Sequence, residues 1–375
     1  MKITELKTTK LAIENKNIYH YSLGALKGTN TILVEIETDE GINGLGECYI
    51  VDPVVTKTFI DHKLTPLIEG KDPINVVSLW DEMFYNTTRF GPMGLQTAAI
   101  GALDISLWDI SSRAVGLPLY KFLGGAAKTK IQLYISQGMG RLKEPLEMRS
   151  EMEKALESGY RAFKIRMDWD SQRLDQDTKK DMLRFEVCRD FLPEDVPLSF
   201  DANNGYSSSV AIMQGRILEN MGAAHFEEPV AQHDLQGLKE CANALDIPVS
   251  FGEQQHTRWQ FRDLIELGNP DILQPDIVLA GGITESRRIY DLAGTYGKLV
   301  MPHCPSAGIA SEASLQLYST YLTAVRPHEY SIEFSGQASE LFKHPYKISD
   351  GYVQLPDDPG LGLELNKKTM EKLII

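Results

Sequence analysis

The sequence of 375 residues predicts a (β/α)8 barrel joined to an α+β capping domain. After residue 129 the chain repeats a short apolar run, a polar loop and an amphipathic stretch. The pattern of the region before residue 129 instead predicts a strand meander followed by helices. Within the repeat, Asp201, Glu227 and Glu253 each close an apolar run at equal intervals, 227 − 201 = 26 and 253 − 227 = 26. That interval is the length of about one strand, one helix and two short loops.

The capping domain is predicted over residues 1–125. Residues 32–37 alternate apolar and polar side chains, and the turn Asp39-Glu40-Gly41 follows them, which is typical of an antiparallel hairpin. Between residues 54 and 115 the apolar period becomes helical, with one apolar face, and Gly116-Leu117-Pro118 ends the last helix. Strands followed by helices indicate an α+β domain.

The barrel is predicted over residues 126–345. Its strands should be short and apolar, because parallel barrel strands are covered on both faces. The candidate strands are residues 131–136, 162–167, 197–201, 224–227, 248–253, 271–276, 299–303 and 330–334. The tail, residues 346–375, is rich in Gly, Pro and Asp and does not fit a βα unit. We expect it to return to the capping domain and make that domain discontinuous.

Composition and charge exclude several classes of protein. A net charge of −14 disfavours a nucleic-acid or membrane partner, since both need a basic surface. A small anionic substrate stays compatible if a metal and a few cations invert the local field. Residues 1–10 lack a signal-peptide pattern and no run is long enough to span a bilayer, so we expect a cytoplasmic protein. The four cysteines show no CxxC spacing, which indicates neither a disulfide framework nor a thiolate zinc site.

Ionisable residues end the predicted strands after the first one, and a barrel places its chemistry at that end. An aspartate after a strand, such as Asp201, is by itself more often a helix cap or a turn residue than a metal ligand. Glu227 and Glu253 are harder to explain that way, because glutamate is a poor cap and costly to bury beside apolar runs. Three converging carboxylates repel one another unless a cation neutralises them, and oxygen ligands favour Mg2+ before Mn2+. Glu228 is expected beside this site, bonded to a ligand or a metal-bound water.

Lys164 and Arg166 lie two residues apart on one predicted strand, so their side chains point to the same face. A solvated pair of surface cations is the alternative, but Phe163 and Ile165 indicate that the other face is covered. Near Arg166 the charged form of Lys164 should be disfavoured, which would let Lys164 act as a base or contact a carboxylate. Arg166 is a poor base and is expected to orient an anionic group.

His303 follows the seventh predicted strand, and Asp276 follows the sixth. A lone histidine is more often structural than catalytic, but neighbouring barrel strands would bring these two side chains within reach. An aspartate bonded to one ring nitrogen fixes the tautomer and leaves the other nitrogen free to take a proton.

The ordered set of motifs resembles the enolase superfamily, specifically its mandelate racemase subgroup (the mandelate racemase/muconate lactonizing enzyme family). The resemblance covers nearly the whole chain. Its motifs are Lys164-Ile165-Arg166, Asp201-Ala202-Asn203, Phe226-Glu227-Glu228-Pro229, Gly252-Glu253-Gln254, Gln274-Pro275-Asp276 and Pro302-His303. It implies an enzyme that removes the proton α to a carboxylate and forms a metal-stabilised enediolate.

The resemblance also implies roles for single residues. Asp201, Glu227 and Glu253 would bind Mg2+, and the Asp276–His303 dyad would be the general base. Glu333 looks like a glutamate that hydrogen-bonds the substrate carboxylate, and Asn203 like a substrate contact. Loops of the capping domain around residues 19–27 and 49–55 would close over the barrel mouth, and the family commonly forms symmetric homo-oligomers.

One departure from the family pattern bears on the reaction. Two-base racemases of the family carry a second lysine where this chain has Arg166, which cannot readily exchange a proton. A dehydratase can work with one base, so the sequence favours an acid-sugar (aldonate or aldarate) dehydratase, a lyase that yields a 2-keto-3-deoxy acid.

Three other functions stay open at the level of the sequence. Because Lys164 could act as a second base, a racemase, epimerase or cycloisomerase is the alternative. A non-catalytic protein that binds metal or sugar acid is a remote alternative. A zinc hydrolase is disfavoured, because the first barrel strand has no HxH pair.

Overall fold

The computed structural model describes the chain from residue 1 to residue 375 except 22–23, 50–51, 92, 138–142, 168–173, 306–307, 332–337 and 346. It begins with three antiparallel strands in the order β1 (Ile3–Tyr21), β2 (Gly24–Thr38) and β3 (Gly44–Cys48). The predicted hairpin is confirmed, with Ile36 of β2 paired to Gly44 of β3. The turn between them needs Gly41, whose φ of 74° suits glycine.

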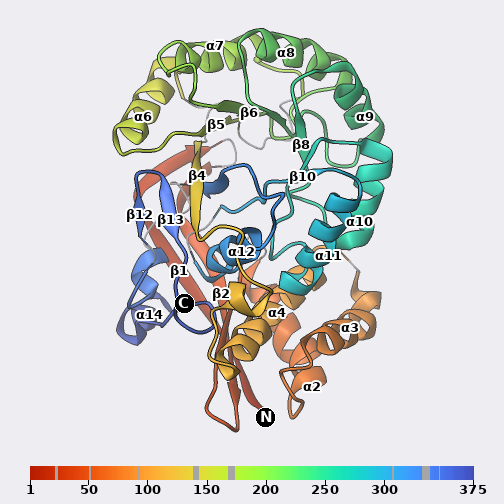
Figure 1. Ribbon diagram of the computed structural model, residues 1–375, viewed down its shortest axis with the longest axis vertical. Helices are drawn as coiled ribbons and strands as arrows, with labels where there is room; N and C mark the ends of the chain where they lie inside the picture. The colour runs from red at the N-terminus through yellow and green to blue at the C-terminus, as the bar shows by residue number, and fades with distance from the viewer. Residues whose placement is uncertain are drawn as a thin grey trace.

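Helices pack against this sheet in the lower part of Figure 1. They are α1 (Pro53–Phe59), η1 (Ile60–Leu64), α2 (Thr65–Ile68), α3 (Val76–Thr87), η2 (Thr88–Phe90), α4 (Leu95–Ala114) and α5 (Leu119–Phe122). The prediction of one apolar face on α4 is wrong, because this helix is buried almost all round. It lies between β3 on one side and barrel helix α11 (Gly282–Thr295) on the other. Gly46 permits the approach, since a Cβ there would lie 1.9 Å from the Ala102 carbonyl oxygen.

Eight parallel strands form the second region, and they pair in chain order. They are β4 (Lys130–Gln137), β5 (Phe163–Arg166), β6 (Leu198–Asp201), β7 (Phe226–Glu227), β8 (Val249–Phe251), β9 (Ile272–Leu273), β10 (Leu299–Val300) and β11 (His328–Ser331). β11 pairs with β4, so the pairing runs from β10 back through β4 to β11. Within the described ranges no backbone pairing joins β10 to β11. The Cys304 N–H, after β10, instead donates to the Glu329 carboxylate of β11 at 2.8 Å.

The barrel helices alternate with the strands along the chain, and those between residues 145 and 263 form an arc around the strands in Figure 1. They are α6 (Pro145–Glu157), α7 (Thr178–Arg189), α8 (Ser208–Asn220), α9 (Leu235–Ala244), α10 (Thr257–Asp263) with η4 (Leu264–Gly268), α11 and α12 (Ile309–Ser319). Together with the N-terminal region this is the predicted barrel with a capping domain. In the described parts of the chain, no helix is both long and apolar enough to cross a bilayer.

Several strands are shorter than predicted, and the last one is shifted. β8, β9 and β10 end two or three residues before Glu253, Asp276 and His303, which therefore lie in the loops that follow. The last strand begins at His328 instead of residue 330, and residues 332–334 of the predicted strand lie outside the described residues. Apolar runs identified the strands but did not distinguish a strand residue from a buried loop residue.

The C-terminal tail contacts both regions. Its hairpin, β12 (Ile348–Ser349) and β13 (Tyr352–Gln354), follows the turn η5 (Ala338–Leu341) and pairs antiparallel with β4. The last helix, α14 (Lys367–Leu373), then lies beside β1, as Figure 1 shows, and the Ile375 N–H donates to the Lys10 carbonyl. The domain boundaries at residues 125 and 345 stay predictions.

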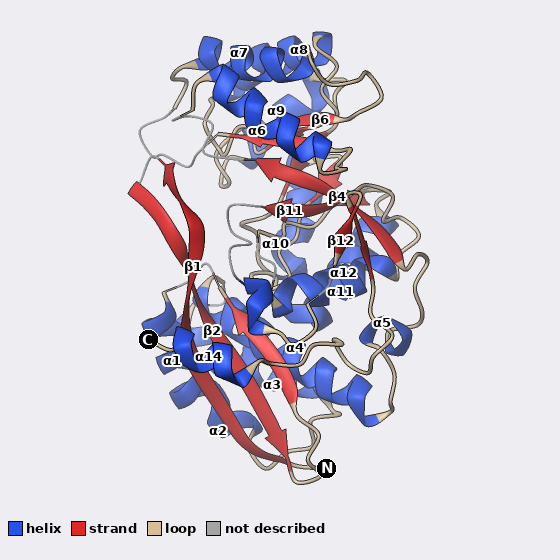
Figure 2. Ribbon diagram, turned by 90° about the vertical axis from the view of Figure 1, so that its left-hand side faces the viewer, coloured by secondary structure: helices blue, strands red, loops and turns tan. Residues whose placement is uncertain are grey.

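Two carboxylates of the capping domain hold the N-termini of two barrel helices. Asp104 of α4 accepts hydrogen bonds from the Thr284 N–H (2.8 Å) and hydroxyl (2.5 Å) in the first turn of α11. Glu47 of β3 accepts from the Ala310 N–H at 3.1 Å in the first turn of α12. A Cβ at Gly282 or Gly308 would lie 2.4 Å from these carboxylates, so glycine leaves room for each cap. Figure 2 shows the capping domain below the barrel.

Asp104 should make stability depend on pH. Burial raises the pKa of this carboxyl to about 7, so the folded state keeps a proton that the unfolded chain loses near its ordinary pKa of about 4. Between pH 4 and 7 the unfolded state binds fewer protons, so the free energy of unfolding falls as pH rises, by at most about 1.4 kcal/mol per pH unit from this group.

We expect Asp104→Asn to remove this contribution, because an amide does not titrate. The variant should gain stability relative to the wild type between pH 5 and 7.5, measured as the midpoint of thermal unfolding. If the unfolding midpoints of the two proteins change with pH in the same way, the prediction is wrong. Asp357→Asn, which changes an exposed tail carboxylate, is the control.

Candidate active site

Three carboxylates meet at the carboxyl ends of neighbouring barrel strands. Asp201 is the last residue of β6, Glu227 is the last residue of β7, and Glu253 follows β8 by two residues. The parallel register pairs Asp201 directly with Glu227. One oxygen from each carboxylate lies within 4.8 Å of the others. The structure therefore brings together the three residues that the equal spacing singled out.

The electrostatics of this cluster fit a divalent cation. Burial, together with the charge of the neighbouring carboxylates, raises the pKa of Asp201 and that of Glu253 to about 7. A bound cation would relieve this repulsion, and an all-oxygen set of ligands suits the hard ion Mg2+. Asp201, Glu227 and Glu253 are the described residues that could hold it.

Lys164 of β5 reaches the same cluster. Its side chain is 1% exposed, and its ammonium group hydrogen-bonds the Glu227 carboxylate and lies 3.3 Å from Asp201 and 3.4 Å from Glu329. Burial alone would lower its pKa, but these carboxylates raise the pKa of Lys164 well above its ordinary value. The expectation of a disfavoured charge is therefore wrong, because the charges of the carboxylates outweigh the effect of burial on Lys164.

Arg166 and Asn203 border the cluster beside Asp201. Arg166 is the last residue of β5, is partly buried and pairs in register with Asp201, whose pKa its charge lowers. The Asn203 backbone N–H and side-chain amide both donate to the Asp201 carboxylate, at 2.8 and 3.2 Å. Its side-chain oxygen is buried and has no hydrogen-bond partner among the described residues, so it can accept a hydrogen bond from a substrate hydroxyl. Substrate contact by either residue stays a prediction.

Glu228 lies behind the cluster and is fully buried. Its two oxygens accept hydrogen bonds from Gln254 (2.9 Å) and Asn204 (2.7 Å). Burial, with the charges of Glu253 and Asp201, raises the pKa of Glu228 well above its ordinary value. Contact of Glu228 with a ligand or a metal-bound water stays a prediction.

The histidine–aspartate pair faces the three carboxylates. His303 Nδ1 lies 2.8 Å from Asp276 Oδ2, and its Nε2 lies 3.6 Å from Glu253 Oε2. Burial lowers the pKa of His303, but the Glu253 charge and the Asp276 hydrogen bond outweigh it and raise the pKa to about 10. A cation bound beside Glu253 would offset that charge and lower this pKa, which leaves Nε2 available as a base.

Asp276 is completely buried, and four donors surround its carboxylate. Oδ1 accepts from the Val278 and Leu279 N–H groups at 2.8 and 2.9 Å. Oδ2 accepts from the Tyr49 hydroxyl at 3.0 Å in addition to its contact with His303. The sequence did not identify Tyr49 as a site residue. Its position at the start of the predicted capping loop 49–55 was the available signal.

Glu329 of β11 is a second residue that sequence reasoning missed. Its carboxylate lies between Lys164 and the Cys304 N–H. Burial alone would raise its pKa, but the charges of Lys164 and His303 hold the pKa of Glu329 well below its ordinary value. The prediction for this strand was Glu333, which lies outside the described residues. The predicted strand begins at residue 330, so Glu329 lies just outside it, whereas β11 begins at His328.

Comparisons with known proteins agree with this arrangement. Residues 3–124 match the family model for the mandelate racemase / muconate lactonizing enzyme N-terminal domain, and residues 147–369 match the model described as enolase C-terminal domain-like. The second match alone spans more than half of the chain.

Relatives of this chain cover nearly its whole length. Arabinonate dehydratase from Saccharolobus solfataricus is 32% identical over 99% of this chain and 98% of the relative. D-galactarolactone cycloisomerase from Agrobacterium fabrum is 29% identical over 99% of this chain and 98% of the relative.

A solved structure shares the fold. The mandelate racemase/muconate lactonizing protein from Paracoccus denitrificans, complexed with magnesium, matches with a TM-score of 0.90 and 32% identity over 99% of this chain and 96% of that chain. The chain belongs to the mandelate racemase/muconate lactonizing enzyme family of the enolase superfamily.

Proposed function

We propose that this protein is a Mg2+-dependent acid-sugar dehydratase, a lyase that converts an aldonate or aldarate to a 2-keto-3-deoxy acid. The observation that carries the proposal is the Asp276–His303 pair, with Nε2 facing the carboxylate cluster of Asp201, Glu227 and Glu253. The arabinonate dehydratase relative supports the reaction class. The enolase superfamily is a known example of a lysine or histidine base that works with Mg2+.

His303 would perform both proton transfers. Its Nε2 takes the proton from the carbon α to the substrate carboxylate, and the C–H electrons move into the carbon–oxygen framework of that carboxylate. The imidazolium then gives the same proton to the β-hydroxyl, whose bond to carbon breaks as water leaves. The resulting enol becomes the 2-keto acid, so the net change is loss of one water molecule. Asp276 stabilises the imidazolium that forms between the two steps.

The remaining residues would bind and orient the acid sugar. When Mg2+ is held by the three carboxylates, it supplies the Lewis acidity that makes the α-proton acidic enough for an imidazole. Arg166 and the Lys164 ammonium provide positive charge toward an anionic substrate. The Asn203 side-chain oxygen, which has no partner among the described residues, would accept a hydrogen bond from a sugar hydroxyl. A small anionic carboxylate is therefore the partner that the site suits.

Arg166 favours dehydration over racemisation. A racemase needs a base on each face of the α-carbon, and the candidates for a second base beside His303 are Lys164 and Arg166. Arginine does not exchange protons at neutral pH, and the Lys164 ammonium is paired with the Glu227 carboxylate. The cycloisomerase relative keeps an isomerase as the second candidate, since it would use the same removal of an α-proton.

Reaction in D2O separates the two candidates. We expect a panel of aldonic and aldaric acids with Mg2+ to yield a 2-keto product, detected by mass spectrometry and by its reaction with semicarbazide. An isomerase would instead give an epimer or a rearranged acid, with deuterium at the α-carbon and no keto product. If no acid in a broad panel yields a keto acid, the dehydratase proposal is lost.

A further inference from the structure

Three polar contacts from the capping domain reach the two barrel units that carry the general base. Asp276 precedes α11, whose first turn is held by Asp104. His303 precedes α12, whose first turn is held by Glu47. The third contact is direct, because the Tyr49 hydroxyl donates to the Asp276 carboxylate at 3.0 Å. The capping domain therefore contacts the base itself in addition to the barrel around it.

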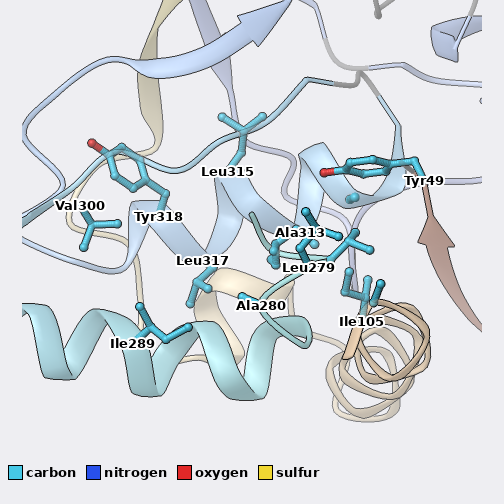
Figure 3. Packing of buried hydrophobic residues seen from close by; sticks show 14 of the residues in the cluster. Tyr49, Ile105, Leu279, Ala280, Ile289, Val300, Ala313, Leu315, Leu317 and Tyr318 are labelled. Atoms are coloured by element: carbon cyan, nitrogen blue, oxygen red, sulfur yellow. The ribbon is translucent and has the colours of Figure 1, made fainter. Parts of the chain in front are cut away.

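Local structure explains why Tyr49 reaches this position. Glu47 lies in β3 and Tyr49 just follows its end, so the two side chains point to the same face of the strand, toward the barrel. Tyr49 is 2% exposed and belongs to the main buried cluster together with Leu279, Ala280 and Ala313. Figure 3 shows Tyr49 extending from the end of β3 in this region. Apolar contacts hold the ring, and its hydroxyl meets a fully buried carboxylate.

The hydroxyl shares its acceptor atom with the histidine. Asp276 Oδ2 accepts from Tyr49, and His303 Nδ1 lies 2.8 Å from the same oxygen. The other oxygen, Oδ1, is occupied by two backbone N–H groups. Tyr49 and the two backbone N–H groups are three fixed donors to the Asp276 carboxylate. The remaining lone pair of Oδ2 can accept one N–H from His303. Nδ1 is then the protonated nitrogen, and Nε2 faces the site.

We propose that Tyr49 is a positioning residue: its hydroxyl holds the Asp276 carboxylate so that His303 keeps its proton on Nδ1 and presents Nε2 to the substrate. The catalytic base is thereby completed by the capping domain and not by the barrel alone. The expected effect on turnover rests on the proposed function. The effect of Tyr49 on the orientation of His303 can be tested without any substrate.

Tyr49→Phe is the variant that tests it, because the ring that fills the cluster remains and one hydroxyl is removed. We expect kcat to fall by about 10-fold or more with KM changed by less than about twofold, a loss similar to that seen when an outer hydrogen-bond partner of a metal-bound histidine is removed. Mg2+ affinity measured by calorimetry should not change, because Tyr49 contacts none of the three carboxylates. Tyr120→Phe, which removes a hydroxyl bonded to the exposed Asp357, should match the wild type.

The readout that is independent of turnover is the tautomer of His303. In Mg2+-loaded protein labelled with 15N-histidine, NMR should show His303 protonated on Nδ1 in the wild type and a mixture of the two tautomers in Tyr49→Phe. His303→Asn identifies the signal. If the wild type turns over no acid sugar but the tautomer still changes in Tyr49→Phe, the proposed function fails and the role of Tyr49 stands.

Three results would overturn the role of Tyr49, two from Tyr49→Phe and one from a second variant. One is a Tyr49→Phe protein with the kcat and the His303 tautomer of the wild type. The other is a Tyr49→Phe protein that no longer folds, because the hydroxyl would then support the fold and not the base. Glu47→Gln weakens the neighbouring contact with α12 without touching Asp276. If it reproduces both changes, docking of the domain is responsible and the hydroxyl is not.

Discussion

Replacing His303 with asparagine is expected to lower kcat by about 10³-fold or more while Mg2+ binding is retained. An asparagine side chain can still bond Asp276, but it cannot take a proton from carbon, and a positioned base contributes roughly 10²- to 10⁴-fold to such reactions. In a dehydratase the loss of kcat should lie at the upper end of this range, because His303 would serve in both proton transfers. Turnover in the keto-acid assay and calorimetry with Mg2+ measure the two effects.

His62→Asn is the matched control, since His62 is exposed on η1 of the capping domain. It should match the wild type in both measurements. A His303→Asn protein that keeps full activity would remove His303 from the mechanism. Full loss of Mg2+ binding in that variant would instead show that the histidine supports the metal site. A protein that only bound sugar acids would be indifferent to the change.

Glu227→Gln is expected to lower Mg2+ affinity by about 100-fold or more and to abolish turnover. Glu227 is the central member of the cluster and is fully buried, so its replacement removes one of three anionic ligands. Calorimetry should show the loss, and thermal unfolding should show that Mg2+ no longer raises the midpoint as it does in the wild type. A chelator should inactivate the wild type, and added Mg2+ should restore it.

The affinity of the wild type for Mg2+, measured by calorimetry, should also depend on pH. Because burial raises the pKa of Asp201 and of Glu253 to about 7, Mg2+ must displace protons from them at lower pH. The affinity of the wild type should therefore rise from pH 6 to pH 8, with proton release during binding. Glu240→Gln, an exposed change on α9, is the control and should leave affinity unchanged. Wild-type levels of Mg2+ binding by Glu227→Gln would contradict the assignment.

The predicted placing of the carboxylates and of the histidine–aspartate pair rested on repetition along the chain, and the structure brings these residues together. The equal spacing of Asp201, Glu227 and Glu253 follows from successive βα units, and such units place their strands side by side with parallel ends. The Asp276–His303 contact followed from the same rule, since β9 and β10 are neighbours. The sequence missed the start of β11, because His328 and Glu329 are polar residues that become buried only in the folded barrel.

The sequence by itself determined the barrel order, the carboxylate cluster and the histidine–aspartate pair. Only the tertiary structure decided the charge of Lys164 and the donors to Asp276. Both depend on groups far apart in the chain: Lys164 meets Glu227 and Glu329, and Tyr49 is separated from Asp276 by 227 residues. Local periodicity carries no information on which distant side chains share a buried space. The pKa of a buried group is set by those neighbours and by the loss of water, so it could not be read from the order of residues.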